Sequence, residues 1–166
     1  MLKKRMIYRL DKGGMFFPLF FMLSLMFSCT DNVVFHSYTS TPEKWNIGDT
    51  VTVSLQDSLS PGIYSFDIET RNTAVYPYRD LWLLMDRTSE INGMEIMRSD
   101  TLHLILADEK GRWTNSKTIG AHSQATHPMG KITIKNSEYR CRFHFRHVMN
   151  DTVLNGITDI GVCLRR

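Results

Sequence analysis

The stretch from Gly62 to Asp86 constrains the fold more than any other part of the sequence. Its first half, 64–69, alternates apolar and polar residues, which is the pattern of a strand with one buried face. Its second half, 81–85, has no polar break, which predicts a strand that is either buried on both faces or central in its sheet. Pro77 separates the halves, because proline does not fit a central strand. The stretch therefore predicts two strands whose connection gathers aromatic residues at one end of a sheet.

Short strands with turn signals between them recur along the rest of the chain. The expected strands are 51–55, 63–70, 81–85, 102–107, 132–134, 139–147 and 157–164. Asn92-Gly93 and Asn155-Gly156 are typical turn dipeptides, and no segment shows a helical period. The least regular stretch, 113–130, is expected to be a long loop. This spacing predicts an all-β protein, a single jelly-roll-like β-sandwich of about eight short strands.

The N-terminal segment has the layout of an export signal. Five basic residues precede an apolar run that ends at Ser28-Cys29. The run is shorter than the roughly 20 residues needed to span a bilayer, and Pro18 interrupts it. A cysteine directly after a small residue indicates lipoprotein processing. We therefore expect a signal peptide over 1–28, a lipidated Cys29 with a tether over 29–44, and a β-sandwich over 45–166. Residues 33–38 would alternatively form a first edge strand.

Charge excludes nucleic acid as an expected partner. The whole chain carries a net charge of +3, but the signal peptide holds five of its basic residues and one of its acidic residues. The mature chain would keep 15 basic and 16 acidic residues. The positive net charge of the whole chain therefore comes from the export signal and does not indicate a nucleic-acid surface.

No residue pattern indicates catalysis or a cofactor. His144 and His147 read as H-x-x-H, but on a strand residues three apart face opposite sides, so we expect no metal there. Nucleophile elbows, glycine-rich phosphate loops and zinc spacings are absent from the sequence. The sequence therefore predicts a protein without enzymatic activity.

Arginines alternate with apolar residues over 139–147. Arg140, Arg142 and Arg146 share one face of this strand with His144. They would either protect a solvated sheet edge or form a basic stripe for an acidic partner or lipid headgroups.

The tryptophans and cysteines leave alternatives open. Trp45, Trp82 and Trp113 would either fill the core or line a sugar-stacking groove. Cys141 and Cys163 are expected to be two buried thiols, because pairing them across the last two strands would mix apolar and basic residues on one face. Strands in different sheets would change that argument.

Several pieces of the sequence occur together in a known order. After the lipoprotein signal come Tyr38 and Trp45, and then YSFDIETRN, YPYRDLW, DTLHLILADEKGRW, YRCRFHFRHVM and LNGITDIGV. In these pieces the chain resembles the GldH gliding-motility lipoproteins of the Bacteroidetes. The resemblance implies a periplasm-facing lipoprotein of the cell envelope, associated with gliding and with type IX secretion. It implies no catalytic residues.

Two functional hypotheses follow. The first is a non-catalytic interaction component of this machinery, held at a membrane by acyl chains on Cys29 and binding other envelope proteins. Its expected partner surface comprises Arg71, Tyr76, Tyr78 and Trp82, a mixture typical of interface hot spots, together with Arg140, Arg142 and Arg146. The alternative is a carbohydrate-binding module on the cell envelope.

A repeated tripeptide predicts modification. Asp followed by Ser or Thr and then an apolar residue resembles the O-glycosylation motif of exported Bacteroidetes proteins. The candidate hydroxyl residues are Thr50, Ser58, Thr101 and Thr152. Strand starts after turns also favour this pattern. Ser58 is the preferred candidate because it precedes the Ser60-Pro61-Gly62 turn.

Overall fold

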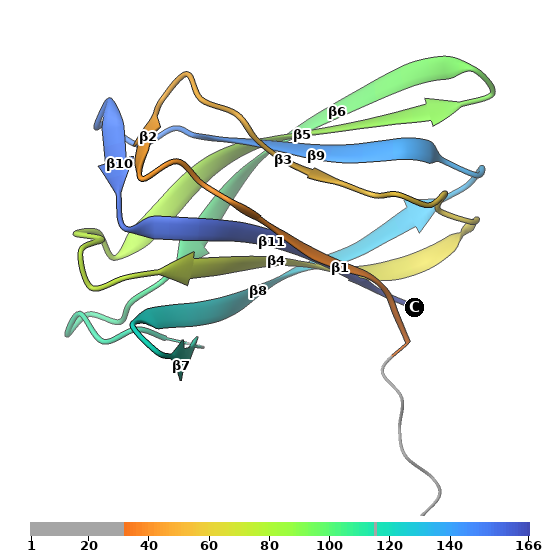
Figure 1. Cartoon of the computed structure of the whole chain (residues 1–166). Helices are drawn as coiled ribbons and strands as arrows, with labels where there is room; N and C mark the ends of the chain where they lie inside the picture. Colours follow the sequence, from red (N-terminus) through yellow and green to blue (C-terminus); the bar gives the residue numbers. More distant parts are fainter. Residues whose placement is uncertain (1–31, 115) are drawn as a thin grey trace, which may run out of the picture. The chain divides into compact units, whose positions relative to one another are not determined.

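A computed structural model describes residues 32–114 and 116–166, and all regular structure in these ranges is β (Figure 1). The strands are β1 (Val33–Ser40), β2 (Lys44–Asn46), β3 (Val51–Ser54), β4 (Gly62–Asn72), β5 (Asp80–Ile91), β6 (Met94–Ile105), β7 (Ser116–Ile119), β8 (His122–Ile134), β9 (Tyr139–His147), β10 (Val153–Asn155) and β11 (Ile157–Arg165). Within the described ranges, no helix is long and apolar enough to cross a membrane.

The strands form a jelly-roll sandwich of two antiparallel sheets (Figure 1). One sheet has five strands in the order β1-β11-β4-β8-β7, and the other has four in the order β3-β9-β5-β6. A two-stranded sheet of β2 and β10 lies at one end. Without β2, β7 and β10, eight strands remain, four in each sheet, in the arrangement of a jelly roll. The predicted fold class is therefore confirmed.

The core lies between the two sheets and is built from alternate residues of each strand. Tyr64, Phe66 and Ile68 of β4 are buried, and Cys141, Phe143 and Phe145 of β9 are buried against them. The Phe66 and Phe143 rings stack across the sandwich with centroids 5.6 Å apart. Period-two alternation thus places one face of each strand in the core, as expected for a sheet with one solvated face.

Two expected elements are more precisely defined by the structure. The run 81–85 belongs to β5, an inner strand of its sheet, which agrees with one of the two interpretations. It is not buried on both faces: Leu81, Leu83 and Met85 face the core, whereas Trp82 is 40% exposed. The stretch 113–130 is not a long loop, because it contains β7 and most of β8, and β7 pairs with residues 122–125 of β8 as an antiparallel hairpin. The buried positions at the start of β8 are Ser123, Ala125 and His127, which are polar or small. The stretch therefore lacks the apolar alternation that identifies a strand.

The first strand lies within the expected tether. Residues 33–40 form β1, which pairs with β11 along the edge of the five-stranded sheet. This is the alternative interpretation of residues 33–38, and it places the start of the folded domain before Trp45. The expected signal peptide over 1–28 and the expected lipidation site Cys29 lie outside the described residues.

Candidate functional site

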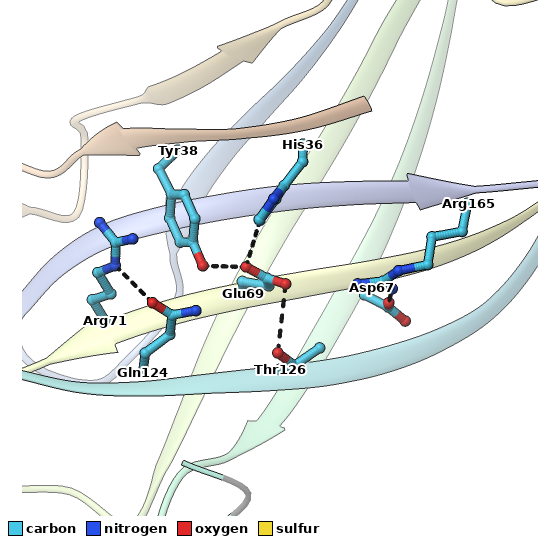
Figure 2. Close-up of polar contacts among 8 residues, drawn as sticks. All are labelled: His36, Tyr38, Asp67, Glu69, Arg71, Gln124, Thr126 and Arg165. Atoms are coloured by element: carbon cyan, nitrogen blue, oxygen red, sulfur yellow. Dashed lines mark hydrogen bonds and ion pairs between the residues drawn. The ribbon is translucent and has the colours of Figure 1, made fainter. Parts of the chain in front are cut away.

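A buried carboxylate on the outer face of the five-stranded sheet is the centre of a polar cluster. Glu69 lies on β4, inside the sheet, yet it points away from the core and is only 3% exposed. Side chains from β1 and β8 cover it from two sides (Figure 2). We call His36, Tyr38, Glu69, Thr126 and Cys163 the Glu69 cluster.

Glycine in the intervening strand allows this contact. Gly161 of β11 lies opposite both Tyr38 of β1 and Glu69 of β4 in the strand register. A Cβ atom at Gly161 would lie 2.7 Å from two atoms of the Tyr38 ring, closer than real Cβ contacts. The missing side chain therefore leaves the space through which Tyr38 reaches across β11 to Glu69.

Hydrogen bonds hold the Glu69 carboxylate in its ionised form. The Tyr38 hydroxyl donates to Oε2, and Nε2 of His36 lies 2.9 Å from the same oxygen (Figure 2). Thr126 Oγ1 lies 3.5 Å from Oε1. Burial alone would raise the pKa of Glu69, but the bonds from Tyr38 and His36 lower it below its ordinary value. Burial and the neighbouring carboxylate raise the pKa of Tyr38, so Tyr38 keeps its proton and acts as a donor.

Two arginines flank the Glu69 cluster, and each has other partners (Figure 2). The Arg71 guanidinium lies over the Tyr38 ring, 3.9 Å from its centroid, and its Nε donates to Gln124 at 3.1 Å. Arg165 forms an ion pair with Asp67. Neither arginine forms an ion pair with Glu69 among the described contacts, in which the basic side chain that contacts Glu69 is His36.

Three different ligand types converge in this cluster. One ligand atom each from His36, Glu69 and Cys163 lies within 4.8 Å of the other two. They come from β1, β4 and β11, the three adjacent strands at this edge of the sheet. This is the group among the described residues that could hold a metal ion.

Sequence reasoning missed this cluster, although its signals are present. Asp67, Glu69 and Arg71 occupy every second position of a strand with an apolar opposite face, and His36 and Tyr38 alternate in the same way. What pattern analysis could not supply is the pairing of the first strand with the last. Without that pairing, Gly161 has no visible role.

The expected aromatic and arginine surface is divided between separate places. Arg71 lies in the Glu69 region, in a different sheet from Trp82. Tyr76 is buried, with its hydroxyl bonded to the carbonyl of Asp80 at 2.6 Å. Only Tyr78 and Trp82 share a site. The connector between β4 and β5 folds inward at Tyr76. Residues that are close in the sequence therefore do not form one common surface.

Tyr78 and Trp82 line a hollow of about 450 Å³ with Asp80 and residues 148–150. The Trp82 indole stacks on His103 with ring centroids 3.9 Å apart, and both side chains bond to the Asp80 carboxylate. We call this the Trp82 hollow. It lies where β5 begins and β9 ends, and it presents an exposed indole beside polar groups.

The other two tryptophans do not extend this platform. Trp45 is fully buried and packs edge-on against His147, and Trp113 is partly buried against the core. The expected groove lined by several exposed tryptophans is therefore absent from the described part of the chain.

The arginine stripe lies on an inner strand. β9 is between β3 and β5, so the interpretation of its arginines as protection for a sheet edge is wrong. Arg140 pairs with Glu90 at 3.1 Å, and Arg146 pairs with Asp86 at 3.1 Å. Arg142 is exposed. Acids on β5 thus offset two of the three positive charges.

The histidines of H-x-x-H face opposite sides, as expected. His144 contacts the hydroxyls of Thr52 and Thr88 on the outer face. His147 is buried on the inner face, where its Nε2 lies 3.1 Å from the Trp45 carbonyl.

The two strands that carry the cysteines, β9 and β11, do not pair with each other. Cys141 lies in the four-stranded sheet and Cys163 in the five-stranded sheet, and both are buried. Cys141 carries a free thiol, so the two are not joined. Burial raises the pKa of Cys141 to about 11, which makes it unreactive at neutral pH.

The four candidate glycosylation residues all face solvent. Thr50, Ser58 and Thr152 lie in loops, and Thr101 lies on the edge strand β6. Their exposure makes each hydroxyl accessible.

Comparison with known proteins now decides the family. The sequence matches the GldH lipoprotein family over residues 33–164, which is nearly the whole described domain. The chain belongs to the GldH lipoprotein family. GldH lipoproteins are proteins of the cell envelope associated with gliding motility, and lipoprotein character implies membrane anchoring.

Other comparisons add little to this GldH chain. No curated protein matches it. Among solved structures, it is similar to the VP2 subviral particle of infectious bursal disease virus, with 13% identity and a TM-score of 0.36. The match covers 78% of this chain and 32% of the viral one. At that TM-score the similarity supports no functional inference.

Proposed function

We propose that this GldH chain is a non-catalytic interaction component of the gliding and type IX secretion machinery. Acyl chains on Cys29 hold it at a membrane, and its sandwich domain faces the periplasm. The family match supports the association with gliding, and the signal-like segment before Cys29 supports the anchor. Its partners are other proteins of the envelope.

The observation that carries the binding role is the exposed indole of Trp82. The Trp82 side chain is 40% exposed and its indole stacks on His103, so an aromatic face is held in place at the surface. Tyr78 and Met149 line the same hollow, and aromatic residues with methionine are enriched at the centres of protein interfaces. The arginines Arg71, Arg140, Arg142 and Arg146 lie elsewhere and are not required for this contact.

A pull-down from the native envelope tests this role. Tagged protein is recovered with its partners from cells that produce either the parent chain or Trp82→Ala. We expect Trp82→Ala to lose partners that the parent retains. Met97→Ala is the matched control, because Met97 is a large apolar residue, 65% exposed, outside the hollow. Equal recovery of all partners by both variants would remove the Trp82 hollow from the proposal.

The second candidate function is carbohydrate binding at the same hollow. An exposed indole beside the Asp80 carboxylate and Asn150 offers a stacking face and polar groups for sugar hydroxyls. Titration of envelope polysaccharide into the purified protein, followed by tryptophan fluorescence, separates the two functions. Saturable quenching that Trp82→Ala abolishes supports the sugar module, and an unchanged signal supports the protein interface.

A further inference from the structure

We infer that the Glu69 cluster binds a divalent transition-metal ion of the Zn²⁺ class through His36, Glu69 and Cys163. An imidazole nitrogen, a carboxylate oxygen and a thiolate sulfur are the donor types that Zn²⁺ takes in proteins. Ca²⁺ and Mg²⁺ prefer all-oxygen sites, so the thiol argues against them. Three protein ligands leave a fourth tetrahedral position for water.

The distances between the ligand atoms are close to those of a loaded site. Zn²⁺ bonds of about 2.0–2.3 Å place tetrahedral ligand atoms about 3.3–3.6 Å apart. His36 Nε2 is 2.9 Å from Glu69 Oε2, and all three ligand atoms lie within 4.8 Å of one another. A shift of about 1 Å would therefore complete the site. The His36 side chain is 43% exposed, so it can move and can admit the ion.

The surroundings support a bound cation. Glu69 is a buried carboxylate, and the basic side chain that contacts it in the described ion pairs is His36, itself one of the three ligands. Tyr38 keeps its proton and orients Oε2, while Thr126 faces Oε1. Hydrogen bonds of this kind fix ligating carboxylates in metal sites.

Binding requires a simple exchange of protons. The Cys163 thiol releases its proton to solvent and coordinates as thiolate. His36 coordinates through Nε2 with its ring proton on Nδ1, so that the Nε2 lone pair faces the ion. Glu69 is already ionised. One proton is released for each ion bound, and no oxidant or reductant is needed.

Metal titration of the full chain tests the inference. The protein is purified in detergent with its tag removed and titrated with Zn²⁺ and, separately, with Co²⁺. We expect one ion per chain and a thiolate-to-cobalt charge-transfer band in the near ultraviolet. Zn²⁺ should also raise the midpoint of thermal unfolding.

Variants locate the site. Cys163→Ser should abolish the charge-transfer band, and His36→Ala should weaken Zn²⁺ binding more than about 100-fold. Tyr38→Phe, which removes only an orienting hydrogen bond, should weaken it about 10–100-fold. Cys141→Ala, Cys29→Ala and His103→Ala are the controls and should bind as the parent does.

Each outcome decides the inference. Absence of binding by the parent, or a cobalt spectrum without a thiolate band, would show that the cluster only holds β1 in place through hydrogen bonds. A band that persists in Cys163→Ser and disappears in Cys29→Ala would place the ion elsewhere. If Cys163→Ser does not fold, His36→Ala remains decisive, because that side chain is partly exposed and its loss leaves the core intact.

Discussion

Gly161 shows how one missing side chain organises a surface. Its position in β11 would normally present a side chain between β1 and β4, and that side chain would separate Tyr38 from Glu69. Instead the Tyr38 ring fills the space, and the buried carboxylate acquires its donors. The arrangement depends on the absence of a single carbon atom.

We predict that Gly161→Ala destabilises the domain by about 1–3 kcal/mol, the usual cost of overpacking. The new Cβ would meet the Tyr38 ring at 2.7 Å and displace it from Glu69. Urea unfolding at neutral pH measures the change. Gly48→Ala is the control, because a Cβ there meets nothing within 4 Å. Similar midpoints for both variants would show that Tyr38 moves aside without cost.

The two tryptophans of different burial give a second prediction. Trp45→Ala should lower the free energy of unfolding by about 3–5 kcal/mol, because Trp45 is fully buried and its indole nitrogen donates to the Asp49 carbonyl. Trp82→Ala should cost less than about 2 kcal/mol, because much of its indole already faces water. Denaturant titration of both variants tests the order, and the reverse order would contradict the burial described here.

We expect at least one of Thr50, Ser58, Thr101 and Thr152 to carry a glycan in the native host. All four are exposed, so an added sugar displaces no core residue. Ser58 remains the preferred candidate. Intact-mass measurement of envelope-purified protein, before and after Ser58→Ala, provides the test. A mass equal to the lipidated polypeptide alone would exclude the modification.

Among the elements, β9 was the most predictable and β8 the least. Alternation of apolar and basic residues predicted β9 from Tyr139 to His147 with the same ends that it has in the structure. β8 has few apolar residues and a bulge near Gly130, whose φ is +96°. The bulge interrupts the alternation of apolar and polar residues, so the sequence does not show one continuous strand. Strand existence could therefore be predicted where one face meets the core.

The candidate site was less predictable than the fold. The Glu69 cluster joins β1, β4 and β11, and such long-range pairing is not encoded in any local pattern. Likewise, the position of β9 inside its sheet depends on β3 and β5, and the alternation within β9 is the same at an edge and in the interior. The periodicity of the sequence shows which face of a strand is buried, but it does not show which strands lie next to one another in the sheet.

Two buried histidines make stability depend on pH. Burial lowers the pKa of His127 on β8 and of His147 on β9, so both are neutral in the folded chain. In the unfolded chain they take up protons below a pKa of about 6.5. The unfolded state then binds more protons, and stability falls as pH decreases below that value.

We therefore predict a loss of stability between pH 7.5 and 5.5, with a slope of at most about 1.4 kcal/mol per pH unit for each histidine. Urea unfolding at several pH values measures it. His147→Gln should reduce the slope, whereas His103→Gln, on the outer face, is the control. An unchanged slope in His147→Gln would mean that His147 is protonated in the folded state as well.

At the scale of the whole molecule, anchoring and folding are separate properties. The described domain, from residue 32 onward, contains a complete sandwich with its own core. The proposed lipid is attached outside it, at Cys29. We predict that Cys29→Ala leaves the domain folded but moves the protein from the membrane fraction to the soluble fraction.

Fractionation of cells followed by immunoblotting tests this prediction, and circular dichroism of the released protein tests its fold. Cys141→Ala should stay with the membrane, since Cys141 lies in the core. A Cys29→Ala protein that remains wholly in the membrane fraction would show that another segment holds it there.

The pairing of β1 with β11 has one further consequence. The backbone nitrogen of Arg166 donates to the carbonyl of Asn32 at 2.9 Å, so the first and last residues of the described domain are neighbours. A short peptide linker could join them, and new chain ends could be opened at the Asn92-Gly93 turn between β5 and β6. We expect such a circular permutant to keep every strand pairing, because the joined ends and the opened turn all lie outside the strands.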